Sequence, residues 1–382
     1  MTAIGRVSWG ILSSVPPTAC GIATFTTALG KALVRRGDDV KMVRILEGDD
    51  ELESSPFEVL SELRAGDRGS IDRAARALNR GDVALIQHEF GLYGGVDGDD
   101  VVALLSKLTV PVVSILHTVL NEPTSNQRCV LERVISLSSC VVVMTAAAEA
   151  TLRRRYRLAE VPVRVIPHGA AIGDIQMARS LDVPPSLLTW GLIGPGKGIE
   201  WAIDAMGLLR DLTPRPRYIV AGRTHPKVLA LDGEAYRRSL ERRVQENDVG
   251  DMVVFDNSYR KLASLNALIA SVDVVVLPYD SADQATSGVL VDAIAAGRPV
   301  IATAFPHSLE MLSSGAGLVV AHRNPRAFAM AIRRIITNPA LATSMAKEAR
   351  RIAPSLGWDG VARQYFDLGR EMLPRVIVRA SA

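Results

Sequence analysis

A polar loop, an apolar helix and a short apolar strand follow one another between residues 284 and 303. Thr286, Ser287 and Gly288 stand where the helix is expected to begin, and the unpaired N–H groups and dipole of a helix start favour an anion such as a phosphate. Asp292 follows just over one turn later in an otherwise apolar helix of about three turns, where its carboxylate suits hydrogen bonds to ribose hydroxyls. An ordinary strand–helix unit with one solvated aspartate fits the same pattern.

Lys197 lies in a glycine-rich turn, Gly-Pro-Gly-Lys-Gly at residues 194–198. The turn is shorter than a P-loop, which needs four residues between its first glycine and Gly-Lys-Ser/Thr. It still places a flexible backbone, including Gly196, and one ammonium just before a predicted helix, and lysine binds phosphate as a point charge. The alternative interpretation is a plain turn with a solvated lysine.

Two apolar runs, at residues 82–88 and 111–117, each end on a histidine. His88 is followed by Glu89, a pair that could bind a metal or transfer protons. Adjacent residues at a strand end point to different faces, and the HExxH spacing of a zinc site is absent. A loop that contacts a polar substrate is therefore the preferred interpretation. His117 is either a satisfied buried histidine or a second site residue.

Nearly continuous Val, Ile and Leu runs alternate with helical segments at roughly 30 residues per unit, which predicts parallel strands covered on both faces and joined by right-handed crossovers. The fold class is therefore α/β, with two doubly wound, Rossmann-like domains, because two comparable series follow each other. The predicted strands are residues 6–13, 39–46, 82–88, 111–117, 140–144, 163–167, 187–193, 217–221, 252–255, 272–277 and 299–303.

The first domain is expected to comprise residues 1–170 and 356–382, and the second residues 171–355. Residues 358–373 have the apolar spacing of a helix, which is expected to cross back to the first domain. Ligands of open α/β sheets bind beyond the carboxyl ends of the strands. Further candidates at such ends are Gly21, Arg223, Asn257 and Tyr259.

Length and composition limit the class of protein. A chain of 382 residues exceeds a single core, and 48% hydrophobic with 22% charged residues is typical of an ordinary soluble globular protein. A net charge of +3 gives no sign of a nucleic-acid partner. Three scattered cysteines favour a reducing compartment, so a cytoplasmic location is expected. No 18-residue uncharged apolar run is present, and the basic run at 153–157 is a solvated face or a contact with an anionic membrane.

The chain resembles the family-4 retaining glycosyltransferases of the GT-B fold, in particular actinobacterial-type hexosyltransferases, over essentially its full length. The resemblance is specific to the family but not to a substrate. The matching segments are PPTACGIAT at 16–24, QHEFG at 87–91, HT at 117–118, RVIPHG at 164–169, Gly191 with Lys197-Gly198, IVAG at 219–222, VVVLP at 274–278 and SGVLVDAIAAGRPVIAT at 287–303.

The resemblance implies a nucleotide-sugar bound mainly to the second domain, in a cleft between the two. Lys197 would hold the diphosphate, Asp292 the ribose, and His117 the donor sugar. The remaining donor-binding residues would be Gly21, Gly196, Arg223, Asn257, Tyr259, Ser287, Gly288 and Val289. On the acceptor side, the resemblance implies His88, Glu89 and Tyr93.

Two departures from the family pattern bear on the mechanism. The family usually has two glutamates eight positions apart, and this chain has Gln284 and Asp292. Leu192 stands where the family usually has an arginine, which removes a positive charge from the leaving group unless Arg223 compensates for it. Gln284 can hydrogen-bond a sugar hydroxyl but cannot be a carboxylate nucleophile, which argues against a covalent intermediate there. A metal-independent front-side displacement, with Lys197 and the helix start stabilising the departing phosphate, is the expected mechanism.

The expected activity is transfer of a hexose, mannose or glucose, to a saccharide or glycoconjugate, as in polysaccharide biosynthesis. GDP-mannose is placed ahead of UDP-glucose as donor, no other cofactor is expected, and the oligomeric state is not predicted. Two alternatives stay open. One is transfer to a lipid-linked acceptor, with peripheral contact at the inner face of a membrane; the other is a non-catalytic relative that binds a sugar nucleotide.

Overall fold

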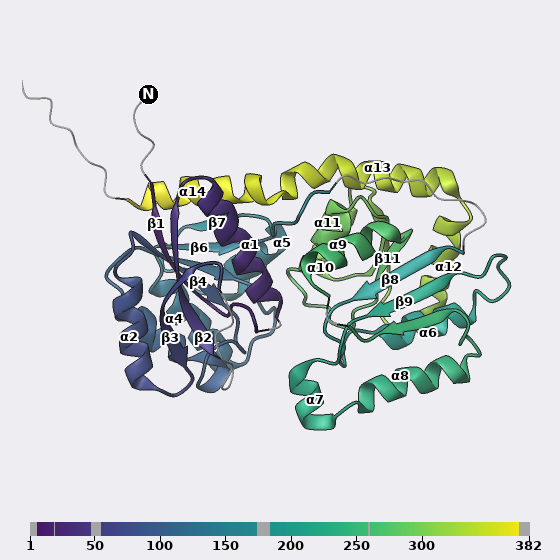
Figure 1. Cartoon of the computed structure of the whole chain (residues 1–382), viewed down its shortest axis with the longest axis horizontal. Coiled ribbons are helices and arrows are strands. Elements are labelled where there is room, and N and C mark those ends of the chain that lie inside the picture. Colours follow the sequence, from purple (N-terminus) through teal and green to yellow (C-terminus); the bar gives the residue numbers. More distant parts are fainter. Residues whose placement is uncertain (1–5, 19, 47–54, 174–183, 259, 374–382) are drawn as a thin grey trace, which may run out of the picture. The chain divides into compact units, whose positions relative to one another are not determined.

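The computed structural model describes residues 6–18, 20–46, 55–173, 184–258 and 260–373 (Figure 1). Its contacts divide the chain into two compact units: unit 1 is Met1–Gly169 with Trp358–Ala382, and unit 2 is Ala170–Gly357. The boundaries expected from the sequence, at residues 170 and 356, differ from these by one and two residues.

Unit 1 contains a seven-stranded parallel sheet in the order β3-β2-β1-β4-β5-β6-β7. This order is that of a doubly wound α/β fold. The strands are β1 (Ser8–Ser13), β2 (Asp39–Leu46), β3 (Glu58–Arg64), β4 (Val83–His88), β5 (Val112–Leu116), β6 (Cys140–Val143) and β7 (Val163–Val165). The helices are α1 (Gly21–Arg35), α2 (Arg68–Leu78), α3 (Asp100–Leu105), α4 (Ser125–Ser136), α5 (Ala146–Arg155) and α14 (Trp358–Met372), with a short 3₁₀ turn η1 (Val96–Gly98).

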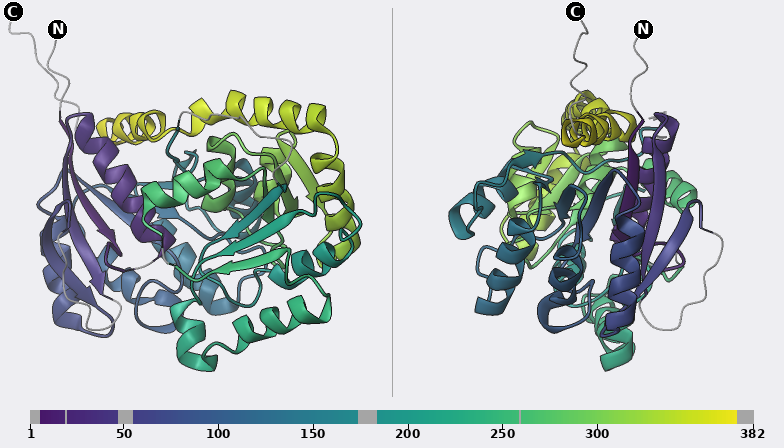
Figure 2. Two further views of the ribbon diagram at one scale, coloured as in Figure 1. Left: turned by 45° about the vertical axis from the view of Figure 1, so that its right-hand side comes forward. Right: turned by 90° about the vertical axis from the view of Figure 1, so that its left-hand side faces the viewer.

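Both faces of the unit 1 sheet are covered, as the views in Figure 2 show. Neighbouring residues of β1 pack into different cores: Trp9 and Ile11 join α1 and α14, whereas Leu12 joins α2 and α3. Alternation of side chains along a strand explains this division. Burial on both sides is why the strands read as continuous apolar runs in the sequence.

Helix α14 belongs to unit 1, as the apolar spacing of its residues predicts. It lies beside α1 (Figure 1), and Val361 and Tyr365 are buried in the core that contains Trp9. Gly369 is required at the closest approach, because a Cβ there would lie 2.4 Å from the Trp9 ring. Arg35 pairs with Asp359 at 2.8 Å across the two helices.

Like the edge strand Gly317–Val320 of unit 2, strand β3 was not among the strands expected from the sequence. It occupies the edge of the sheet, and most of its residues are exposed or half-buried. Edge strands carry charged side chains that discourage further pairing, so β3 lacks the apolar run by which buried strands are recognised.

Unit 2 contains a six-stranded parallel sheet in the order β10-β9-β8-β11-β12-β13. Its two faces are covered by separate cores, one beneath α6, α8 and α12 and one beneath α9, α10 and α13. The strands are β8 (Ser186–Trp190), β9 (Arg217–Ala221), β10 (Val253–Asp256), β11 (Val274–Leu277), β12 (Val300–Thr303) and β13 (Gly317–Val320). The helices are α6 (Ile199–Gly207), α7 (Pro226–Asp232), α8 (Ala235–Glu246), α9 (Leu262–Ser271), α10 (Gly288–Ala295), α11 (Pro306–Leu312), α12 (Pro325–Ile336) and α13 (Pro339–Leu356).

Helix α10 is shorter than the sequence suggests. It has eight residues, about two turns rather than three. Ser287 is its N-cap, with Oγ accepting the N–H of Leu290 at 3.2 Å. Gly297 follows the helix with φ 64°, the left-handed conformation that ends helices and that glycine adopts without strain.

Replacing Gly198 by alanine is expected to destabilise unit 2. Gly198 has φ 64°, and its Cβ would lie 1.8 Å from the carbonyl oxygen of Pro278. Gly196 has φ 86° but no atom within 4 Å of the Cβ position, so Gly196→Ala measures the backbone strain alone. Urea unfolding should show Gly198→Ala to be the less stable variant by at least about 2 kcal/mol. Equal losses in the two variants would show that the contact with Pro278 is relaxed at no cost.

Candidate functional site

The carboxyl edge of the unit 2 sheet brings together the residues that the sequence selects in this half. In sheet order, Asn257 follows β10, Arg223 follows β9, Lys197 follows β8, and Gln284 precedes α10 after β11. Neighbouring strands lie about 4.8 Å apart, so these loops form one continuous border. Tyr259 lies outside the described residues.

Lys197 carries a partly desolvated positive charge. Its Nζ lies 4.9 Å from the centre of the Tyr279 ring, and the side chain is half-buried. Desolvation by burial lowers the pKa of its amine. No carboxylate pairs with it among the residues that the structure describes. A cation held against an aromatic face without a counter-ion is suited to an anionic ligand.

Hydrogen bonds to the residues that follow β11 hold the Lys197 turn in place. The N–H of Asp280 donates to the carbonyl oxygen of Gly196 at 3.0 Å. The carbonyl oxygen of Tyr279 accepts from Thr303 Oγ1 at 2.7 Å and from His322 Nδ1 at 2.9 Å. His322 and Tyr279 therefore hold the Lys197 turn in place, and the part that His322 plays is visible only in the tertiary structure.

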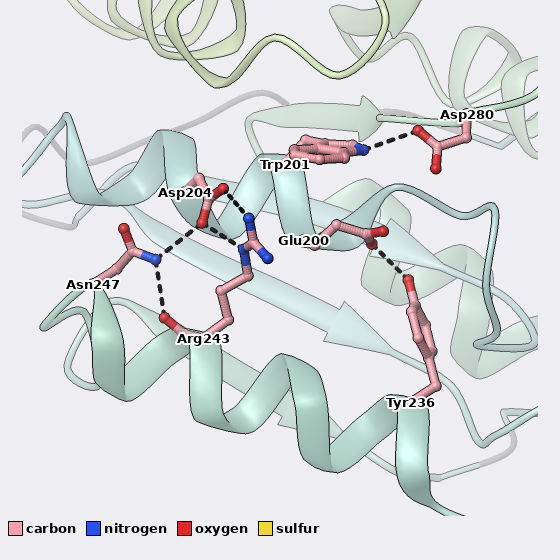
Figure 3. A network of polar contacts seen from close by, with 7 residues as sticks. All are labelled: Glu200, Trp201, Asp204, Tyr236, Arg243, Asn247 and Asp280. Carbon is pink, nitrogen blue, oxygen red and sulfur yellow. Dashed lines mark hydrogen bonds and ion pairs between the residues drawn. The ribbon is translucent and has the colours of Figure 1, made fainter. Parts of the chain in front are cut away.

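A polar network joins α6, which begins directly after the Lys197 turn, to α8 and to Asp280 (Figure 3). Trp201 Nε1 donates to Asp280 at 2.9 Å. Arg243 makes two hydrogen bonds to Asp204, at 2.7 and 2.6 Å, a geometry that fixes direction as well as distance. Tyr236 donates to Glu200 at 2.7 Å, as Figure 3 also shows. These contacts hold α6, and with it the end of the Lys197 turn.

The start of α10 has two backbone N–H groups available for a ligand. The N–H of Ser287 donates to His307 Nδ1 at 2.9 Å. The N–H groups of Gly288 and Val289 have no acceptor in the part of the chain that the structure describes. Of the three amides that the resemblance selects, those of Gly288 and Val289 therefore retain the capacity to bind an anion.

Asp292 lies half-buried on α10, and its carboxyl has no hydrogen-bond or ion-pair partner among the described residues. Burial raises its pKa to about 7. Buried carboxyl groups normally have hydrogen-bond donors around them, so this one is suited to the hydroxyl groups of a ligand.

Two further predicted residues have local partners. Gln284 Nε2 donates to the carbonyl oxygen of Thr286 at 3.2 Å. Arg223 is exposed, and its carbonyl oxygen accepts from the N–H of Ile193 at 2.9 Å. This bond places Arg223 beside Leu192, which lines a small hollow next to Lys197. Leu192 therefore gives this hollow an apolar side chain where the family usually has an arginine.

In unit 1, His117 lies after β5 with one ring nitrogen bound. Its Nε2 is 2.6 Å from Gln87 Oε1, and its ring meets Phe25 edge-on at 5.2 Å. Burial lowers the pKa of His117 to about 3, with smaller effects from His168 and His88. The imidazole is therefore neutral near pH 7 and serves as a hydrogen-bonding group rather than a cation.

The other predicted residues of unit 1 are more enclosed than a surface loop suggests. His88 is 1% exposed and Tyr93 7%, and the Tyr93 hydroxyl donates to the carbonyl oxygen of Gln87 at 2.5 Å. Glu89 is half-buried and accepts from Thr118 and from the N–H of Phe90. Their contact with an acceptor stays a prediction.

Gly21 is the first residue of α1, and no atom lies within 4 Å of its Cβ position. Neighbouring atoms therefore do not require glycine there. Close approach of a phosphate to Gly21 stays a prediction.

Two classes of feature are absent from the described part of the chain. No group of three or more His, Cys, Asp or Glu side chains in these ranges is placed to hold a metal ion. No helix there is long and apolar enough to cross a membrane. The basic run after residue 152 ends α5, where positive charge is favoured by the helix dipole, and Arg153 pairs with Glu149 at 2.7 Å.

Comparison with protein families assigns each unit separately. Residues 184–338 match the model described as glycosyl transferases group 1, and residues 19–172 match glycosyltransferase family 4. The fold and these two matches define the class: the chain belongs to the GT-B glycosyltransferases.

Two curated relatives are D-inositol 3-phosphate glycosyltransferases. That of Corynebacterium urealyticum is 25% identical over 66% of this chain and 61% of its own length. That of Kineococcus radiotolerans is 28% identical over 63% of this chain and 58% of its own length. The match therefore spans about six tenths of each relative.

Solved structures show the same fold along nearly the whole chain. Sucrose-phosphate synthase from Thermosynechococcus elongatus has a TM-score of 0.76 and 22% identity, covering 96% of this chain and 99% of the other. HepE from Anabaena, solved with UDP and glucose, has a TM-score of 0.76 and 16% identity, covering 96% and 100%. At this level of identity the likeness establishes the fold.

Asp292→Asn is expected to stabilise the free protein at alkaline pH. The pKa of Asp292 rises from 3.8 to about 7 on folding, so the folded state binds more protons between these values and the free energy of unfolding falls as pH rises through them. Asparagine does not ionise, so the variant avoids this fall in the free energy of unfolding. At pH 8 the variant should be more stable by about 1–2 kcal/mol in urea unfolding, with a smaller difference at pH 4.

The exposed Asp283 provides the control, because Asp283→Asn makes the same change in the loop before α10. It should leave stability unchanged at both pH values. A destabilised Asp292→Asn variant at pH 8 would show that the carboxylate has a stabilising partner.

Proposed function

We propose that the protein is a retaining glycosyltransferase that transfers a hexose from a nucleotide-sugar to a hydroxyl of a saccharide or glycoconjugate. The observation that carries the proposal is the desolvated charge of Lys197, which has no carboxylate partner among the described residues, on the same sheet edge as the two α10 amides that have no acceptor among those residues. Both features favour a diphosphate.

In this proposal the diphosphate lies at Lys197 and at the N–H groups of Gly288 and Val289. Asp292 accepts hydrogen bonds from the ribose hydroxyls, which suits a half-buried carboxyl that has no partner in the described part of the chain. Arg223 adds positive charge beside Leu192, in place of the arginine of the family. Gln284 and the neutral His117 hydrogen-bond hydroxyl groups of the transferred sugar.

The proposed reaction is a front-side displacement. The bond between the anomeric carbon and the phosphate oxygen breaks, and its electron pair stays on the phosphate. The acceptor oxygen bonds to the same face of that carbon, and its proton passes to the departing phosphate. Lys197 and the start of α10 stabilise the charge that develops on the leaving group. A carboxylate nucleophile is not required, which agrees with an amide at position 284.

This chemistry is proposed to need no metal ion, because a lysine and two backbone amides supply the positive charge. GDP-mannose is proposed ahead of UDP-glucose. The UDP bound to HepE and the inositol phosphate in the names of the curated relatives make UDP-sugars and a phosphorylated polyol necessary members of any substrate panel.

A turnover assay with GDP-, UDP- and ADP-hexoses, each with saccharide and inositol phosphate acceptors and with EDTA present, tests the activity. Release of nucleoside diphosphate together with a glycoside that keeps the donor's anomeric configuration, determined by NMR, is the expected result. An inverted product would contradict the mechanism. Binding without turnover of any donor would favour the non-catalytic alternative, and turnover confined to lipid-linked acceptors in vesicles would favour the membrane alternative.

Lys197→Ala should lower kcat/KM by at least about 100-fold, because it removes the charge nearest the leaving group. Lys347, exposed on α13, provides the control, since Lys347→Ala makes the same change elsewhere in unit 2. Circular dichroism should show both variants folded. A Lys197→Ala enzyme with near-normal kcat/KM would remove Lys197 from the site.

A further inference from the structure

Arg237 is a buried cation at the carboxyl edge of the unit 2 sheet that the mechanism above does not use. It lies on α8 and is 6% exposed. Its guanidinium stands over the Phe255 ring at 5.9 Å, and its Nη2 donates to the carbonyl oxygen of Gly222 at 2.6 Å. Glu234 balances its charge at 3.5 Å.

The remaining partner of Arg237 is the side chain of Asn257. Nη1 of Arg237 donates to Oδ1 of Asn257. A guanidinium has only donors, so the amide of Asn257 cannot be reversed: its oxygen must face Arg237 and its nitrogen must face away. Asn257 is exposed, and its Nδ2 has no acceptor among the described residues. The side chain of Asn257 therefore turns its two N–H donors toward a ligand, while its oxygen is directed at the guanidinium of Arg237.

The position of Asn257 suits the base of a nucleotide. It follows β10, which is separated from β8 and the Lys197 turn by β9 alone. Two strand spacings amount to about 10 Å, comparable to the length of a nucleoside. A nucleotide with its phosphates at Lys197 therefore brings its base to the region of Asn257.

We infer that Arg237 orients Asn257 to select a nucleobase that presents a carbonyl oxygen, uracil or guanine, over adenine. This inference rests on the proposed binding of a nucleotide-sugar. An asparagine that reads adenine uses both amide groups, its oxygen accepting from the 6-amino group and its nitrogen donating to N7. Here the oxygen is directed at Arg237, so it is not placed to meet the 6-amino group while the nitrogen meets N7. Guanine O6 and N7, or uracil O4, require only donors, which Asn257 still has.

The roles of the two residues are distinct. Asn257 contacts the base, and Arg237 is a positioning residue that acts through Asn257. Arg237 also holds Gly222, so its removal is expected to disturb the loop after β9 as well. Substitution of the exposed Asn257 is therefore the cleaner test.

Titration calorimetry with UDP, GDP and ADP on the full chain measures this selectivity. The wild type should bind UDP or GDP about 10-fold more tightly than ADP, the value of one hydrogen bond. In Asn257→Asp one oxygen stays with Arg237 and the other faces the base as an acceptor. The variant should shift the affinity ratio toward ADP by about 10-fold or more. All three ligands carry the same diphosphate, so the added negative charge weakens the binding of each of them equally. The ratio of two affinities is therefore not affected by that charge.

Gln245→Glu is the control, because Gln245 is exposed on α8 and the substitution adds the same negative charge away from this edge of the sheet. Its ratio of UDP or GDP affinity to ADP affinity should equal that of the wild type. Asn257→Ala should bring the three affinities closer together. A wild-type preference for ADP, or an unchanged ratio in Asn257→Asp, would overturn the inference and leave nucleotide binding intact. Failure of the wild type to bind any of the three would overturn the proposed function itself.

Discussion

The site in unit 2 depends on charge that the protein leaves unpaired. Lys197 is partly desolvated against Tyr279 and has no carboxylate partner among the described residues. Asp292, on α10, has no donor partner among the same residues. Pairing these groups with neighbours would stabilise the fold, because desolvated charges without partners cost free energy. Leaving them unpaired keeps both available for a ligand, a conflict between stability and function that is common at active sites.

Such an arrangement requires a rigid frame, since a flexible lysine would turn toward solvent. The frame is built from hydrogen bonds to the backbone: Asp280 holds the carbonyl oxygen of Gly196, while Thr303 and His322 hold that of Tyr279. Trp201 connects Asp280 to α6. Gly198 permits the turn to pass against Pro278 where any side chain would collide. Arg237 fixes the loops after β9 and β10 in a similar way, by hydrogen bonds to the carbonyl oxygen of Gly222 and to the side chain of Asn257.

The sequence predicts the two parallel sheets well, because strands buried on both faces leave continuous apolar runs. It misses the edge strands β3 and β13, whose residues are mostly half-buried or exposed. It places Lys197 and the loop that begins α10 on one sheet edge, since residues after parallel strands share that edge. Arg237 and His322 escape it, because their importance comes from partners distant in the chain. It also does not show that His88 and Tyr93 are enclosed, since burial after a strand depends on the packing of the loop that follows.

The most direct test of the central claim is a crystal structure with bound UDP or GDP. The distance to measure is that between the Lys197 Nζ and the nearest oxygen of the terminal phosphate. The account predicts about 3 Å, with the same phosphate group in contact with the N–H groups of Gly288 and Val289. A diphosphate bound elsewhere, with the lysine still facing only the Tyr279 ring, would contradict it.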